Sequence, residues 1–144
     1  MPGPEPPGAA PPLNVSILSQ GSYLIVSIHT ALDDSQMLQL QEDLIAQVGR
    51  RRSRGIIVDV AALDVLDSFG TRTLTQLAEM ARLRGAETVV VGIAPDIAVA
   101  MVRLSLQLNF VHTALDLEEG LELLGELTGP HDRAALAQGS RRVE

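Results

Sequence analysis

Short apolar runs alternate with longer amphipathic stretches along most of this chain, and this alternation limits its possible folds more than any other feature. Strand-like runs occupy about residues 15–17, 23–28, 56–60 and 88–91, with a short one at 110–111. Helix-like stretches cover about 33–48, 68–84 and 95–108, and a last one has leucines at 117, 121 and 124. Strands that alternate with helices need crossover connections. The sequence therefore predicts an α/β fold with a mixed, mostly parallel sheet and about four helices.

Local signals support these boundaries. Gly21 and Ser22 predict a turn that joins the first two strands as a hairpin, and Asp33 or Asp34 can cap the first helix. Gly85 is placed to end the second helix. One stripe of the first helix is expected to face the core, formed by Met37, Leu38, Gln41, Leu44, Ile45 and Val48.

The organised part of the chain is expected to be a single domain over residues 13–128. Residues 1–12 hold six of the eight prolines and show no apolar periodicity, so they are interpreted as a disordered tail. Gly129 and Pro130 should stop the last helix, and residues 129–144 are interpreted as a second flexible tail.

Composition excludes several classes of function. No apolar run is long enough to span a membrane and no signal peptide is recognisable, so a soluble, cytoplasmic protein is expected. The chain has no cysteine and no lysine, which rules out thiol catalysis, a P-loop and Schiff-base chemistry. A net charge of −7 disfavours binding to nucleic acid.

One basic cluster breaks this acidic character. Arg50, Arg51, Arg52 and Arg54 follow the first predicted helix. Cations are favourable at a helix C-terminus, so a solvated helix end is one interpretation. A surface that binds a partner is the other.

No set of residues predicts an enzyme, a metal site or a cofactor site. The three histidines are scattered, and the motifs of nucleotide-binding and hydrolase folds are absent. Asp59, Asp64 and Asp67 gather around one strand end, where a phosphorylated aspartate would need a lysine that the chain lacks.

Ser68 begins the second predicted helix and has two interpretations. It can be the N-cap, although Asp67 could serve equally well. It can also be a modified residue, because a phosphate is stabilised at a helix N-terminus. Gly70 removes bulk beside it, and Phe69 is expected to be partly exposed.

The segment from Val58 to Leu74, with Asp67-Ser-Phe-Gly70 at its centre, resembles the Asp-Ser-x-Gly signature of STAS domains, the family of bacterial anti-sigma-factor antagonists. The order of elements matches that fold over about residues 13–127. Stressosome scaffold subunits are especially similar, in segments that include YLIVSI (23–28), IIVDV (56–60), LDVLDSF (63–69), GIAPDIAVAMV (92–102) and TALDLEEGL (113–121).

The resemblance implies a non-enzymatic switch protein that holds a serine kinase and releases it when Ser68 is phosphorylated. Asp64, Asp67, Phe69, Gly70 and Thr71 would form the docking surface, and the added phosphate would repel the docked partner.

The same resemblance implies homo- and hetero-oligomers with paralogous sensor subunits. Those sensors carry a second phosphoacceptor threonine in a segment that here reads Pro95-Asp-Ile-Ala-Val-Ala100, without a hydroxyl. They also carry an extra N-terminal domain, where this sequence has only the proline-rich segment 1–12. Both departures favour the scaffold. The alternatives are an antagonist that binds an anti-sigma kinase directly and, less favoured, a STAS module that binds a small molecule.

Overall fold

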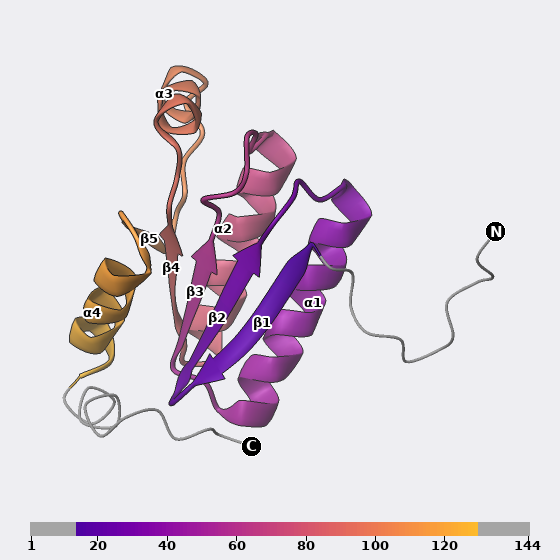
Figure 1. The fold of residues 1–144 in the computed structure, drawn as a ribbon. Coiled ribbons are helices and arrows are strands. Elements are labelled where there is room, and N and C mark those ends of the chain that lie inside the picture. The colour runs from indigo at the N-terminus through magenta and orange to yellow at the C-terminus, as the bar shows by residue number, and fades with distance from the viewer. Residues whose placement is uncertain (1–13, 130–144) are drawn as a thin grey trace.

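The computed structural model describes residues 14–129, which form one five-stranded sheet with helices on both faces (Figure 1). The strands are β1 (Val15–Gln20), β2 (Tyr23–Ile28), β3 (Gly55–Asp59), β4 (Glu87–Val91) and β5 (Val111–Ala114). The helices are α1 (Asp34–Arg51), α2 (Ser68–Leu83), α3 (Pro95–Arg103) and α4 (Leu117–Thr128). The two predicted tails lie outside the described residues, apart from Gly129.

The strands lie side by side in chain order, β1-β2-β3-β4-β5. β1 and β2 form the predicted antiparallel hairpin, in which Gln20 pairs with Tyr23 across a turn that Gly21 makes with φ 57°. β2, β3, β4 and β5 are parallel to one another. The predicted mixed, mostly parallel sheet is thus confirmed.

The helices divide between the two faces of the sheet. Parallel crossovers are right-handed, so a sheet built in chain order keeps its connecting helices on one face. α1 and α2 cover that face, and α3 contributes Ile97 and Met101 to the same core. α4 follows the last strand and covers the opposite face (Figure 1), where its Leu124 completes a smaller core. The buried members of the smaller core are Tyr23, Ile25, Ile57, Val89, Val91 and Leu124.

α1 begins at a complete capping box. The Asp33 carboxylate accepts a hydrogen bond from the backbone N–H of Gln36 at 2.8 Å, and the Gln36 side chain accepts one from the Asp33 N–H at 2.9 Å. The Gln36 N–H, followed by the Ser35 hydroxyl, holds the pKa of Asp33 below its usual value. The predicted start of this helix is therefore confirmed.

The interior of α1 and its end differ from the prediction. Leu38 is 45% exposed and Leu40 is buried in its place, because the buried stripe follows the faces that meet α2 and the sheet. The helix continues to Arg51, three residues beyond the predicted end, and stops where Arg52 adopts a left-handed backbone with φ 51°.

α3 ends at Arg103 rather than at the predicted Leu108. Ser105 adopts φ 55°, its N–H bonds to the carbonyl of Val102, and the N–H of Leu106 bonds to the carbonyl of Met101. This is the Schellman motif that usually carries glycine at the left-handed position. The sequence offers no glycine there, so the stop could not be recognised from residue types.

The last strand also differs from the prediction. The apolar pair Phe110–Val111 suggested a short strand, but Phe110 has φ 65° and stands outside it. β5 runs over Val111–Ala114 instead, paired with β4. Within residues 14–129, no helix is both long enough and apolar enough to cross a membrane.

Candidate functional site

The candidate site lies on the connection between β3 and α2, at the carboxyl end of the parallel strands. The Asp59 carboxylate accepts a hydrogen bond from the N–H of Ala61 at 2.9 Å, which turns the chain as it leaves β3. The N–H of Val60 bonds to the carbonyl of Val91 at 3.0 Å, and Leu63 is buried. The connection is therefore attached to the sheet before it reaches Ser68.

Asp67, and not Ser68, caps α2. Asp67 has an extended backbone, and its carboxylate accepts a hydrogen bond from the N–H of Gly70 at 2.8 Å. Its carbonyl accepts the N–H of Thr71 at 2.9 Å. Ser68 is the first residue of the helix and is exposed. Within the described part of the chain its hydroxyl makes no hydrogen bond, so the interpretation of Ser68 as the cap is wrong.

Gly70 is buried and tightly packed. A Cβ added to it would lie 3.0 Å from Cδ1 of Leu66 and 3.3 Å from the capping oxygen of Asp67. The lack of bulk at Gly70 leaves room for the Leu66 side chain and for the Asp67 cap. Phe69 is half-buried against the larger core, which agrees with its expected partial exposure.

Thr71 and Thr73 do not lie on the surface. Each is only 3% exposed, because both lie on the side of α2 that faces the core. The Thr73 hydroxyl donates to the carbonyl of Phe69 at 2.8 Å, while the Thr71 hydroxyl oxygen is buried and has no hydrogen-bond partner among residues 14–129. The burial of Thr71 does not fit its expected place on the docking surface, which Thr71 can influence only through the position of α2.

The exposed residues around Ser68 are acidic or apolar. Asp64, Val65 and Asp67 are exposed, and Val65 and Asp67 line a small hollow of about 70 Å³ together with Phe69 and Gly70. The three aspartates of this region do not converge. Asp59 and Asp67 are each used for a backbone hydrogen bond, and within the described chain no group of three acidic or histidine side chains could hold a metal ion.

The connection between β4 and α3 lies directly against this site. Gly92 has φ 80°, and a Cβ added to it would lie 2.9 Å from the Cβ of Ala61 and 3.1 Å from its backbone nitrogen. Glycine is therefore required both by the backbone and by the close approach. The sequence analysis missed this contact, because no signal in either segment relates residue 92 to residue 61.

Both histidines within residues 14–129 have local partners, and His131 lies outside the described residues. His29 lies 2.8 Å from the Ser16 hydroxyl, and Nε2 of His112 lies 3.3 Å from the Glu87 carboxylate. The two pairs come from different parts of the sheet. Neither is near Ser68 in the chain, and neither forms part of a larger polar cluster.

Comparison with known proteins gives consistent results. The family model of the STAS domain matches residues 14–120. The RsbT co-antagonist protein RsbRA of Bacillus subtilis is 30% identical over 108 residues, which are 75% of this chain and 38% of RsbRA. The chain thus spans well under half the length of that relative.

Two solved structures share this fold and are at least 30% identical to the chain in sequence. A variant of RsbS from Moorella thermoacetica is 34% identical, with a TM-score of 0.68 over 78% of this chain and 96% of the other. A chain from the molecular architecture of the stressosome, a signal integration and transduction hub, is 30% identical, with a TM-score of 0.64 over 80% of this chain and 100% of the other.

Proposed function

Because the chain belongs to the STAS-domain family, we propose that it is a non-enzymatic, cytoplasmic stressosome scaffold subunit that holds a switch serine kinase and releases it when Ser68 is phosphorylated. Its likeness to RsbS and to a stressosome chain supports the scaffold role. Paralogous STAS sensors would be its partners in the assembly.

The observation that carries this proposal is the state of Ser68. Its side chain is exposed at the first position of α2, and the neighbouring Asp67 already provides the cap. A kinase can therefore reach the hydroxyl. Phosphorylation of Ser68 would break no hydrogen bond, because its hydroxyl makes none within residues 14–129. The free N–H groups of the first helical turn favour a phosphate at this position.

The release step follows from charge and desolvation. A phosphate adds a charge of about −1.5 to −2 at neutral pH. Asp64 and Asp67 are exposed close by in the chain, so the added charge enters a surface that is already acidic. A partner that covers Ser68 would have to remove water from these charges without pairing all of them, which weakens its binding.

A scaffold is favoured over a sensor by the surface of α3. Pro95 begins this helix, and residues 95–100 include Asp96, Ala98, Val99 and Ala100 as exposed side chains. None of the residues in this segment has a hydroxyl. The second phosphoacceptor that the resemblance assigns to sensors therefore has no counterpart here.

The test is to compare Ser68→Ala and Ser68→Asp chains as baits in native lysate. The captured kinase and the Ser68 phosphopeptide are identified by mass spectrometry. Ser68→Ala should retain the kinase and lack the phosphate, whereas Ser68→Asp should retain at least about tenfold less kinase, a difference of about 1.4 kcal/mol. Ser105→Asp is the matched control, because Ser105 is also exposed but lies after α3.

Two results would contradict the proposal. Full retention of the kinase by Ser68→Asp would show that charge at this position does not release it. Recovery of the wild-type chain in a small complex with one anti-sigma kinase, without longer STAS proteins, would instead identify an antagonist that binds its kinase directly.

A further inference from the structure

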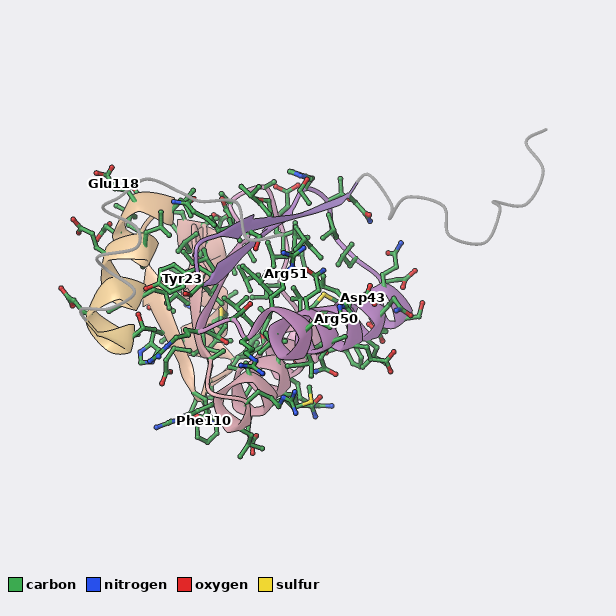
Figure 2. The ribbon with its side chains drawn as sticks, turned by 90° about the horizontal axis from the view of Figure 1, so that it is seen from below. Tyr23, Asp43, Arg50, Arg51, Phe110 and Glu118 are labelled. Carbon is green, nitrogen blue, oxygen red and sulfur yellow. The ribbon has the colours of Figure 1, made fainter. Side chains whose placement is uncertain are left out.

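Five arginines gather at the end of the domain opposite Ser68. α1 and α2 run antiparallel to the strands that they connect, so both helices end where β3 and β4 begin. This brings together one group of side chains, here called the arginine end, which consists of Arg50, Arg51, Arg52, Arg54 and Arg84. Figure 2 views the molecule from this end. On a chain with a net charge of −7, such a concentration of positive charge needs an explanation.

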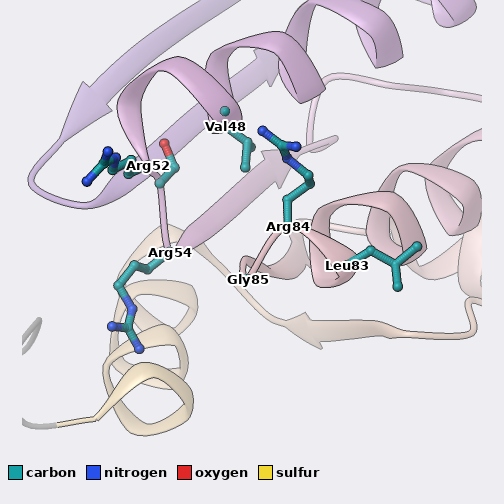
Figure 3. Close-up of a pocket in the computed structure, with 8 residues that line it drawn as sticks. Val48, Arg52, Arg54, Leu83, Arg84 and Gly85 are labelled. Atoms are coloured by element: carbon teal, nitrogen blue, oxygen red, sulfur yellow. The ribbon is translucent and has the colours of Figure 1, made fainter.

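The arginine end surrounds a shallow hollow of about 650 Å³ (Figure 3). Arg52, Arg54 and Arg84 line it, and the remaining lining residues are apolar or small, with no acidic side chain. Leu83 stands at its edge and is 85% exposed. The hollow therefore offers positive charge together with an uncovered apolar side chain, a combination that is common at protein interfaces.

The helix ends account for only part of this charge. Nη2 of Arg54 donates to the carbonyl of Thr128 at the end of α4, at 3.3 Å. A helix C-terminus carries roughly half a negative charge, so the ends of α1 and α2 together offset about one positive charge. Arg50, Arg52 and Arg84 form no ion pair within residues 14–129.

α4 shows the opposite imbalance. Its outer face carries Glu118, Glu119, Glu122 and Glu126, all of them exposed. Glu118, Glu122 and Glu126 follow one another at intervals of four residues, a spacing at which like charges destabilise a helix. None of the four glutamates forms an ion pair with another described residue.

Within one molecule the arginine end reaches α4 at its carboxyl end, where Arg54 bonds to Thr128, whereas the glutamates at the start of α4 lie farther away. In Figure 2, Glu118 projects from α4 at one side of the domain, well away from Arg50 and Arg51 at the end of α1. We infer that the arginine end of one copy of this chain docks against the glutamate face of α4 on a second copy. Charge complementarity selects this occupant, because each surface supplies what the other lacks.

A contact between two different surfaces has a consequence for assembly. Each copy that uses its arginine end still has its α4 free, and the next copy can bind there. Such heterologous contacts produce rings or larger particles rather than closed pairs. This inference goes beyond the phosphorylation switch and uses surfaces away from Ser68.

The test uses two folded variants of the full chain in sedimentation velocity. Chain X carries Arg52→Glu with Arg84→Glu, and chain Y carries Glu118→Arg with Glu122→Arg. The wild-type chain should associate at about 0.05 M salt and dissociate at about 0.5 M, because screening weakens exposed charge pairs. X alone keeps the acidic α4 face but loses most of the positive charge of its arginine end, and Y alone keeps the arginine end but loses the negative charge of its α4 face. Each variant therefore lacks one of the two complementary surfaces and should sediment as a monomer. An equimolar mixture of X and Y should associate again.

A charge-matched control is Arg72→Glu with Arg103→Glu, two exposed arginines outside the arginine end, which should associate like the wild type. Circular dichroism and melting curves establish that each variant is folded. If X is unfolded, Arg52→Gln with Arg84→Gln should still weaken association at least about tenfold. A monomeric wild type at low salt, a folded X that associates normally, or an X and Y mixture that stays monomeric would each overturn the inference.

Discussion

Two neighbouring residues at the start of α2 have separate tasks. Asp67 satisfies the N–H of Gly70 with its carboxylate, whereas Ser68 is exposed and its hydroxyl makes no hydrogen bond within residues 14–129. A serine that also served as the cap would lose that hydrogen bond whenever it was modified. The division therefore permits a chemical change at Ser68 without loss of the helix start.

Replacing Asp67 should separate its structural task from its charge. We expect Asp67→Ala to lower the free energy of unfolding by about 1 kcal/mol, because the N–H of Gly70 loses its partner. Asp67→Asn keeps an acceptor oxygen and should cost clearly less. Urea unfolding of both variants measures the difference, with Asp64→Ala as the control at an exposed aspartate without a hydrogen bond in the described chain. Equal losses for Asp67→Ala and Asp64→Ala would refute the capping role.

At the scale of elements, loops that are distant in sequence hold the Ser68 connection in place. The chain leaving β4 presses Gly92 against Ala61, and the N–H of Val60 is bonded to the carbonyl of Val91. Inside the helical layer, the buried Gln41 of α1 donates to the carbonyl of Thr73 in α2 at 3.1 Å. The position of Ser68 therefore depends on β4 and α1 as well as on its own helix.

Gly92→Ala should disturb this arrangement, and Gly85→Ala provides a matched control. Both glycines have a positive φ, of 80° and 86°, but a Cβ at Gly85 would meet no atom within 4 Å. We expect Gly85→Ala to cost about 1–2 kcal/mol from the backbone alone, and Gly92→Ala to cost more because it also collides with Ala61. Amide chemical shifts of Ser68 and its neighbours should move only in Gly92→Ala. Equal costs and unchanged shifts would show that the contact with Ala61 is unimportant.

At the scale of the whole molecule, the two faces of the sheet are covered unequally. The larger core is built from three helices and one face of the sheet. The smaller core lies between α4 and the other face, and it has six buried residues, of which only Leu124 belongs to α4. α4 also has a polar attachment, since the Tyr23 hydroxyl lies 2.7 Å from that of Thr128. Charge differs between the two ends of the domain. Aspartates cap the starts of three helices, at positions 33, 67 and 116, and arginines lie at the ends of α1 and α2.

Because the core beneath α4 has six buried residues and the larger core has eighteen, α4 should open before α2 and β3. Hydrogen exchange should show lower protection in α4 than in α2 or β3. Leu124→Ala, which leaves a cavity at a residue with no exposed surface, should cost about 2–5 kcal/mol and increase exchange first in α4. Leu77→Ala in the larger core is the comparison, and it should increase exchange throughout. Uniform protection in the wild type would contradict this division.

The class of fold, the order of the elements and most of their starts could be predicted from local sequence patterns. These depend on local properties: apolar periodicity, a capping aspartate, or a glycine after a helix. The Asp-Ser-Phe-Gly motif was also visible locally, and it placed Ser68 at the start of a helix that the structure confirms.

Local patterns could not predict which individual side chains are buried or which surfaces lie together, because both depend on how the elements pack in three dimensions. Leu38 and Thr71 were misplaced because the partners of α1 and α2 lie far away in the chain, and Ser105 ends α3 through backbone bonds that its residue type does not announce. The gathering of Arg84 with the arginines after α1 required the helices to end together at one side of the sheet. Such juxtapositions depend on contacts between distant segments, and local periodicity carries no information about them.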